Sequence, residues 1–188
     1  MRLTKEQRAE NHEKIVKVAA KLFREKGVDG VGIDEIMAAA GLTHGAFYGH
    51  FPSKTALTAE AGAQALAESR LAQRRAAQES QLPFVGFARF YLSDRHRDAP
   101  GGGCAVAGMG ADIGRQDDEV QAVFSQGMEA AVDELAAQLP GPRDVARRDA
   151  IAKYASLIGA LIMARSVGKT PLSHEILDTV RQKLEAEG

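Results

Sequence analysis

Six residues between positions 43 and 54 carry groups that suit contact with a nucleic acid. They are Thr43, His44, Gly45, Tyr48, His50 and Lys54. Hydroxyl, imidazole, phenol and ammonium groups can hydrogen-bond to phosphate oxygens and to base edges. Gly45 has no Cβ, so its backbone can approach a phosphate or a base closely. Lys54 is expected in the first turn of a helix, where a cation opposes the helix dipole unless an anion such as phosphate is bound.

The surrounding residues predict the elements that position these groups. Gly41 lets the chain turn, and Pro52 ends the preceding helix because it disfavours helical angles at residue 51. Ser53 can cap the helix that follows, and Thr43 is expected to cap the one before it. Four apolar residues ahead of the turn lie at helical spacing: Ile33, Ile36, Met37 and Ala40. A glycine-containing turn between two short helices is how a helix-turn-helix places its second helix in a DNA groove.

The segment from Phe47 to Lys54, read as Phe-Tyr-x-His-Phe-x-Ser-Lys, resembles the DNA-binding domain of TetR-type bacterial repressors. The match runs from about Ile15 to Leu57. The resemblance implies that Thr43 and His44 face bases or backbone at the start of the recognition helix. It also implies that three residues contact DNA phosphates: Tyr48, His50 and Lys54. Phe47 and Phe51 are predicted to be packing residues.

The start of the second helix departs from the family pattern. Val31 and Gly32 stand where the family usually has a Ser or Thr that caps the helix and touches a phosphate. Asp34 occupies a position that is often basic, so the resemblance does not extend to phosphate contacts from this helix. Three basic residues lie near the N-terminus: Arg2, Lys5 and Arg8. Two interpretations of them remain open, a flexible basic arm that binds DNA and a solvated tail.

Length and composition restrict the class of protein. With 188 residues, of which 45% are hydrophobic, the chain can bury a core and form one or two small domains. No apolar run approaches the roughly 20 residues that span a membrane, and the polar N-terminus has no signal-peptide core. A single cysteine excludes an internal disulfide framework, so we expect a reducing, cytoplasmic location.

Charge is unevenly distributed along the chain, although the net charge of −1 does not by itself indicate a nucleic acid. Residues 1–54 contain nine Lys or Arg and seven Asp or Glu, a net charge of +2. Residues 55–188 contain fifteen and eighteen, a net charge of −3. A basic first part on an acidic remainder has the sign expected of a DNA-binding domain joined to a second domain.

Strand patterns are absent and helix-forming residues dominate, which predicts an all-α fold of about nine helices. The expected helices cover about 11–26, 33–40, 43–50, 54–78, 84–94, 104–114, 120–135, 143–167 and 172–185. Residues 98–103 contain a proline and three glycines and are not expected to be helical. We predict a DNA-binding helix-turn-helix domain at 1–54 and an effector-binding and dimerisation domain at 55–188, connected by the long fourth helix.

The sequence allows two interpretations of Cys104. It is expected at the first turn of a helix behind the glycines 101–103, where free N–H groups and the helix dipole favour a reactive thiolate. Three arginines close in sequence could add to that effect: Arg95, Arg97 and Arg115. The Gly-Cys segment also resembles a TetR subgroup in which this cysteine senses electrophiles or oxidants. The other reading is a small buried packing residue, as most free cysteines are.

The apolar residues of the second domain suggest a ligand pocket and a subunit interface. The predicted pocket residues are Phe87, Tyr91, Met109, Phe124, Met128 and Leu161. The predicted homodimer interface, a four-helix arrangement built from the last two long helices, uses Ile158, Leu161, Ile162 and Leu177. Both expectations follow from apolar positions at helical spacing and from what the resemblance implies about the family.

Together these patterns predict a transcriptional repressor of TetR type, without cofactor. It would act as a homodimer on double-stranded, near-palindromic operator DNA and be released by a small-molecule or thiol-reactive effector. No His, Cys or carboxylate residues lie at metal-ligand spacing and no hydrolase nucleophile motif is present, so neither a metal site nor an enzyme is expected. Two alternatives remain open: a Cys104-dependent redox enzyme, and a helical interaction protein that no longer binds DNA.

Overall fold

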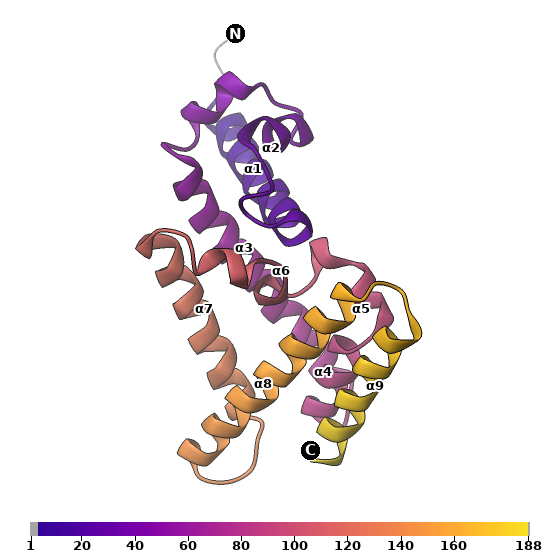
Figure 1. The fold of residues 1–188 in the computed structure, drawn as a ribbon. Helices are drawn as coiled ribbons and strands as arrows, with labels where there is room; N and C mark the ends of the chain where they lie inside the picture. Colours follow the sequence, from indigo (N-terminus) through magenta and orange to yellow (C-terminus); the bar gives the residue numbers. More distant parts are fainter. Residues whose placement is uncertain (1–3, 188) are drawn as a thin grey trace.

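The computed structural model describes residues 4–187, and every regular element in that range is a helix (Figure 1). The α-helices are α1 (Lys5–Lys26), α2 (Ile33–Ala39), α3 (Lys54–Gln78), α4 (Pro83–Tyr91), α5 (Asp94–Asp98), α6 (Ala105–Ile113), α7 (Asp118–Ala136), α8 (Arg143–Ser166) and α9 (Pro171–Ala186). Two 3₁₀ helices complete the set, η1 (His44–Gly49) and η2 (Pro100–Gly102). The prediction of an all-α fold is confirmed. Within the described range, no helix is both long enough and apolar enough to cross a lipid bilayer.

Local capping chemistry sets the ends of the helices near the N-terminus. The Oγ1 of Thr4 accepts the backbone N–H of Gln7, and the Gln7 side chain accepts the N–H of Thr4 in return. This capping box starts α1 at Lys5, earlier than predicted. Lys5 and Arg8 are therefore helical, so the prediction of a flexible basic arm is wrong for them. Arg2 lies outside the described residues.

Caps are also present at the end of α1 and at the start of α3, and the second of these was predicted. Gly27 follows α1 with a φ of 78°, a left-handed value that disfavours residues with a Cβ, and its N–H bonds the carbonyl of Phe23. The Oγ of Ser53 accepts the N–H of Ala56 at 3.1 Å and starts α3. The long connecting helix therefore has the predicted bounds.

The predicted fifth helix ends earlier than expected, and a further short helix that was not predicted follows it. α4 ends at Tyr91, and α5 begins at Asp94 after Ser93, whose Oγ accepts the N–H of His96 at 3.2 Å. Serine competes for backbone groups in this way and so stops one helix and caps the next. The Pro-Gly segment was predicted to be non-helical, but its residues Pro100–Gly102 form the short 3₁₀ helix η2. These short elements bring the chain back toward α1 before α6.

A small head and a larger body are arranged along α3 (Figure 1). α1, α2 and η1 form the head, and α3 runs from it into the body, where α8 and α9 lie side by side. One hydrophobic core joins the head to α3, α6 and α7, and a second joins α4, α7, α8 and α9. The head packs directly on α6, and α3 connects it to α7 within the first core.

Candidate nucleic-acid interface and effector site

The recognition segment η1 is anchored to the head by two aromatic rings. Phe47 and Phe51 are both buried, with ring centroids 5.7 Å apart, which confirms that they are packing residues. Burying this side of a short helix leaves the opposite side in solvent. Tyr48 is 65% exposed, and three further predicted contact residues are also exposed: Thr43, His44 and Gly45. The structure therefore brings four of the six predicted DNA-contact residues to one exposed segment.

The recognition segment is a 3₁₀ helix rather than the regular α-helix that the sequence predicts. Two of its six residues are glycines, Gly45 and Gly49, which disfavour a regular α-helix. The prediction that Thr43 caps the segment is wrong, because its side chain makes no capping hydrogen bond. Its backbone carbonyl accepts the N–H of Ala46 at 3.0 Å instead. The Thr43 hydroxyl is therefore not used within the segment.

The end of the recognition segment is held by α1. A guanidinium N–H of Arg8 donates to the carbonyl oxygen of Gly49. The following His50 is half-buried, and its Nδ1 makes no hydrogen bond within the described residues. Burial lowers the pKa of His50, and the neighbouring His12 and Arg8 lower it further. His50 is therefore uncharged at neutral pH, and any bond from it to a phosphate would be a neutral one.

Lys54 has a partner inside the head. Its Nζ donates to the carbonyl oxygen of Val28 at 2.8 Å and lies 5.9 Å from the centre of the Phe23 ring. The sequence predicts that a phosphate offsets this cation at a helix start. In the structure a backbone carbonyl has that role. An ammonium group has three donors, so contact between Lys54 and a phosphate remains a prediction.

The departures from the family pattern have a local explanation. Val31 is buried in the first core, where an apolar side chain is required. Gly32 is the N-cap of α2 and provides no side-chain cap. Asp34, in the first turn of α2, lies against the recognition segment, because its Oδ1 is 2.5 Å from the Nδ1 of His44. An acidic residue is thus part of the surface that carries the predicted DNA contacts.

The turn between α1 and α2 is held from two sides by the body. The backbone N–H of Val28 donates to the Oδ2 of Asp112 in α6 at 2.8 Å, while its carbonyl accepts Lys54 from α3. The turn fits closely, because a Cβ at Gly27 would lie 2.4 Å from that same Oδ2. A partly buried ion pair, from Arg24 of α1 to Glu68 of α3 at 2.6 Å, adds a further link. The head is therefore positioned by polar contacts with α3 and α6.

Cys104 is the N-cap residue of α6 and is only 4% exposed. The glycines 101–103 do not leave its thiol open to solvent. Its backbone N–H donates to the Nε2 of His96 at 3.0 Å, and the Nδ1 of His96 bonds the carbonyl of Tyr91 at 2.8 Å. This arrangement requires the proton on Nδ1. Burial lowers the pKa of His96 to about 4, so the ring is uncharged at neutral pH.

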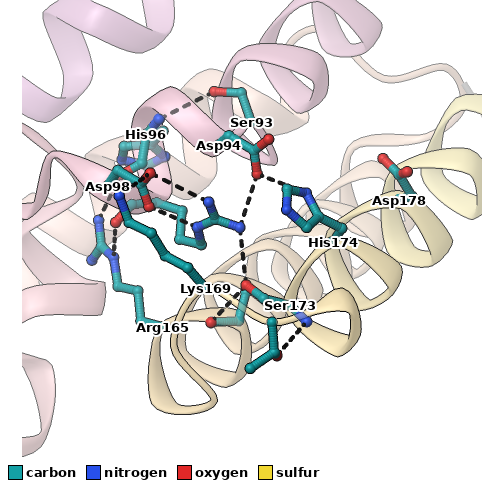
Figure 2. Close-up of polar contacts among 12 residues, drawn as sticks. Ser93, Asp94, His96, Asp98, Arg165, Lys169, Ser173, His174 and Asp178 are labelled. Carbon is teal, nitrogen blue, oxygen red and sulfur yellow. Dashed lines mark hydrogen bonds and ion pairs between the residues drawn. The ribbon is translucent and has the colours of Figure 1, made fainter.

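A guanidinium from α8 lies beside this cysteine, and sequence reasoning did not find it. Arg165 donates from Nη2 to the carbonyl of His96 at 2.9 Å and from Nε to the carbonyl of Arg97 at 3.1 Å (Figure 2). Burial lowers the pKa of Arg165, while Tyr91 and Cys104 act in the opposite direction. Cys104 and Arg165 are far apart in the chain, so no local spacing could have linked them.

Two of the three arginines predicted to assist Cys104 have other partners. Arg97 pairs with Asp98 at 2.8 Å, and Arg115 pairs with Asp112 at 2.5 Å. Arg95 is exposed on α5. Proximity in sequence was misleading here, because the Nη1 of Arg97 donates to the Oγ of Ser173 in α9 at 3.1 Å. Neither ion pair places a guanidinium at the thiol.

A cavity of about 10 Å³ adjoins Cys104. Its lining includes Ser69, Phe90, Tyr91, His96 and Gly103. The Tyr91 hydroxyl is buried and has no hydrogen-bond partner within residues 4–187. Burial raises the pKa of Tyr91 well above its ordinary value, with a further contribution from Cys104. The phenol is therefore a neutral donor next to the thiol.

The six residues predicted to line one ligand pocket divide between the two cores. Met109 and Phe124 are buried in the first core, whereas Tyr91 and Leu161 belong to the second. Met128 packs against the second core, and Phe87 lines a different cavity of about 20 Å³ beside Tyr154 and Glu134. That volume accommodates about one water molecule. Helical spacing identified buried residues correctly but did not show which core each one joins.

Two of the four predicted interface residues are core residues of the subunit. Leu161 and Leu177 are buried between α8, α9 and their neighbours, so the prediction that they contact a partner is wrong. Ile158 is half-buried and Ile162 is 45% exposed. Other large apolar side chains on α8 and α9 are also exposed: Ile151, Met163 and Leu172. A groove between the two helices continues this face and is lined by residues such as Gly159, Met163, Leu172, Ile176 and Val180.

Comparison with known proteins places the head in a family. Residues 15–61 match the family model described as bacterial regulatory proteins of the tetR family. The head is therefore similar to the DNA-binding domain of the tetR family. The matched range contains the recognition segment, its aromatic anchor and the first turns of α3. It therefore covers all six residues predicted to contact DNA.

Curated relatives match this chain over part of its length. The HTH-type transcriptional regulator AcrR of Shigella flexneri is 35% identical over 82 residues, which cover 44% of this chain and 37% of AcrR. The uncharacterized HTH-type transcriptional regulator YerO of Bacillus subtilis is 46% identical over 48 residues, covering 26% of this chain and 17% of YerO. The chain thus matches about a third or less of the length of these relatives.

Solved structures share the whole fold at low sequence identity. The reduced form of E. coli NemR has a TM-score of 0.78 at 17% identity, covering 94% of this chain and 96% of that one. A TetR regulator from Legionella pneumophila has a TM-score of 0.77 at 17% identity, covering 100% and 99%. One from Cytophaga hutchinsonii has a TM-score of 0.78 at 18% identity, covering 99% and 98%. These similarities show that the body as well as the head has the fold of TetR regulators.

Proposed function

We propose that this protein is a DNA-binding transcriptional repressor that binds a near-palindromic operator as a homodimer in the cytoplasm. The observation that carries the proposal is the recognition segment, where buried Phe47 and Phe51 hold Thr43, His44 and Tyr48 on the exposed side. Residues 1–54 serve as the DNA-binding domain and 55–188 as the effector-binding and dimerisation domain. The two recognition segments of such a dimer enter major grooves about 34 Å apart, or a multiple of that distance.

The exposed apolar face of α8 and α9 supports the homodimer. Ile162 and Met163 are large apolar side chains that a monomer would leave in water. An exposed apolar face rimmed by polar residues is typical of a protein interface. We assign the interface to this face, with Ile158 at its edge.

We also propose that the effector acts at Cys104. The guanidinium of Arg165 lies close to Gly103, and the buried phenol of Tyr91 lines the cavity that adjoins Cys104. The adjoining cavity of about 10 Å³ has room for one water molecule at most, so a small oxidant such as hydrogen peroxide requires less movement of its neighbours than a large ligand does. The thiolate would form an S–O bond as the O–O bond breaks, giving a sulfenic acid and hydroxide, which takes up a proton to become water. Larger thiol-reactive electrophiles would require the cavity to open.

The contacts around Cys104 suggest how modification reaches the head. The Oγ of Ser69 in α3 accepts the N–H of Ala105 at 3.0 Å, so the cysteine segment is attached to the connecting helix. Gly101 lies against α1, because a Cβ there would be 2.3 Å from the Oε1 of Glu25. A thiol that gains an oxygen must displace one of these neighbours. If the effector prefers the displaced state by about 10–100-fold, or about 1.4–2.8 kcal/mol, release from DNA follows.

A regulatory role explains Cys104 better than a redox enzyme does. A thiol peroxidase that turns over needs a second thiol or an external one to resolve the sulfenic acid, and this chain has one cysteine. Consumption of peroxide with a thiol reductant separates the two roles. Turnover would indicate the enzyme, and a single modification per subunit would indicate the regulator.

Selection from a random double-stranded DNA library tests the repressor proposal. The full chain should enrich one near-palindromic sequence with half-sites related by a two-fold axis. The matched control is the double variant Thr43→Ala/Tyr48→Ala, which alters two exposed side chains and should keep the fold. Equal enrichment by both proteins would contradict the proposal and favour a helical interaction protein.

A further inference from the structure

We propose that Asp34 is a specificity-determining residue, because it holds His44 so that the two residues read one base pair in each operator half-site. The inference rests on the proposed DNA-binding function and deepens it. It assigns a base-reading role to an acidic residue of α2, a helix whose start carries no Ser or Thr for a phosphate.

The geometry joins the two helices of the helix-turn-helix through one contact. Asp34 is in the first turn of α2, and His44 is the first residue of η1. The Oδ1 of Asp34 lies 2.5 Å from the Nδ1 of His44, and both side chains are at least half exposed. The ring of Tyr48 lies edge-on to the imidazole, with centroids 6.2 Å apart. The imidazole is therefore held between a carboxylate and a phenol ring on the exposed side of the recognition segment.

This contact determines which hydrogen bonds His44 can offer. A carboxylate accepts only, so Nδ1 must carry the proton that it donates to Asp34. In the uncharged ring Nε2 is then an acceptor, and His44 makes no second hydrogen bond within residues 4–187. The second oxygen of Asp34 is also an acceptor. In the major groove, acceptors pair with the exocyclic amino groups of cytosine and adenine.

The charge of Asp34 favours a role in discrimination over one in affinity. A carboxylate on a DNA-binding surface is repelled by phosphates and lowers affinity for every sequence. Repulsive elements of this kind give specificity by penalising the wrong partner. Guanine O6 and N7 or thymine O4 opposite the Asp34–His44 pair would place acceptors against acceptors. The pair therefore rejects those bases and selects cytosine or adenine at one position.

The alternative role for Asp34 is to stabilise α2 alone, because a carboxylate in the first turn interacts favourably with the positive end of the helix dipole. Glu35 is the matched control for that role, because it is in the same first turn and carries the same charge. Its carboxylate pairs with Lys26 of α1 at 2.5 Å and not with the recognition segment. Asp34→Asn and Glu35→Gln each remove one negative charge from the same helix turn. Only Asp34→Asn removes the acceptor charge that orients His44.

The experiment measures base preference at each operator position, by selection from a half-site library at pH 8, where a free imidazole is uncharged. For Asp34→Asn we expect preference for cytosine or adenine at one symmetric position to fall about tenfold, with unchanged or tighter binding to random DNA. Glu35→Gln should keep all preferences. His44→Ala should lose preference at the same position as Asp34→Asn. The double variant Asp34→Asn/His44→Ala should lose no more than His44→Ala alone.

Two results would overturn the proposal. One is an Asp34→Asn protein that keeps every base preference and changes affinity for all sequences equally, as Glu35→Gln does. The other is loss of preference at different positions in the Asp34 and His44 variants. Thermal unfolding of each variant shows that the fold is intact. Failure of the unaltered protein to enrich any sequence would reject the DNA-binding function itself and is recognisable before any variant is made.

Discussion

The carboxylate of Asp112 in α6 accepts the backbone N–H of Val28, at the turn between α1 and α2, at 2.8 Å. This hydrogen bond is a direct contact between the body of the protein and the head. Val28 is buried, so water cannot replace the acceptor. The position of α6 is therefore transmitted directly to the turn that precedes the helix-turn-helix.

Replacing Asp112 with Ala should destabilise the protein by about 1–3 kcal/mol, the cost of leaving a buried amide without an acceptor. Asp112→Asn keeps an acceptor oxygen and should recover most of the loss. Chemical denaturation of both variants measures the difference. Equal stability of Asp112→Ala and the unaltered protein would mean that the bond contributes nothing to holding the head.

Removing the Tyr48 hydroxyl should weaken operator binding and leave the fold unchanged. Tyr48→Phe keeps the ring and removes the group inferred to donate to a phosphate. Hydrogen bonds to charged groups contribute about 1.5–3 kcal/mol, so affinity should fall at least tenfold. Because phosphate contacts do not read sequence, the loss should be similar for operator variants and should reduce the salt dependence. A change of less than about twofold by gel shift would place the phosphate contact elsewhere.

Replacing Ile162 with Glu should dissociate the homodimer. Ile162 is 45% exposed on α8, and a carboxylate buried without a partner in an apolar interface costs several kcal/mol. The control is Leu71→Glu on α3, because Leu71 has a similar exposure of 49%. Sedimentation should show monomers for the first variant and dimers for the second. A dimeric Ile162→Glu protein would move the interface to another face.

Adding one methyl group at Gly101 should disturb the head, whereas adding one at Gly102 should not. A Cβ at Gly101 would lie 2.3 Å from Glu25 and 2.9 Å from the Cγ of Lys21, both on α1. A Cβ at Gly102 meets nothing within 4 Å. Overpacking of this kind costs about 1–3 kcal/mol. We expect Gly101→Ala to lower both thermal stability and operator affinity relative to Gly102→Ala. Identical behaviour of the two variants would exclude this loop as a link to α1.

Hydrogen peroxide should add one oxygen atom per subunit at Cys104 and release the operator. Cys104→Ser should bind the operator normally and ignore peroxide. Arg165→Gln removes the neighbouring cation and should slow the reaction. Intact-protein mass spectrometry measures the added oxygen, and gel shifts measure release of the operator in the same sample. A folded protein that gains no oxygen atom would make Cys104 a packing residue, and the effector would then be a reversibly bound ligand.

Elements defined by neighbouring residues could be predicted from the sequence. Pro52 and Ser53 end one helix and start the next because their effects act within one helical turn. Phe47 and Phe51 are packing residues, as predicted, and their rings lie together in the core of the head. The split between α4 and α5 was missed, although Ser93 carried the signal, because one cap among apolar residues competes weakly with a continuous helical pattern.

The placement of residues on opposite sides of a helix, or far apart in the chain, was decided only by tertiary packing. Leu161 and Ile162 are adjacent and equally apolar, yet one is buried in the subunit core and the other is in solvent, because the orientation of α8 depends on α4, α7 and α9. Cys104 and Arg165 come together in the same way. Helical periodicity is a local property and specifies which residues share a face. Which face meets another helix depends on the free energy of packing the whole chain, and no short segment contains that information.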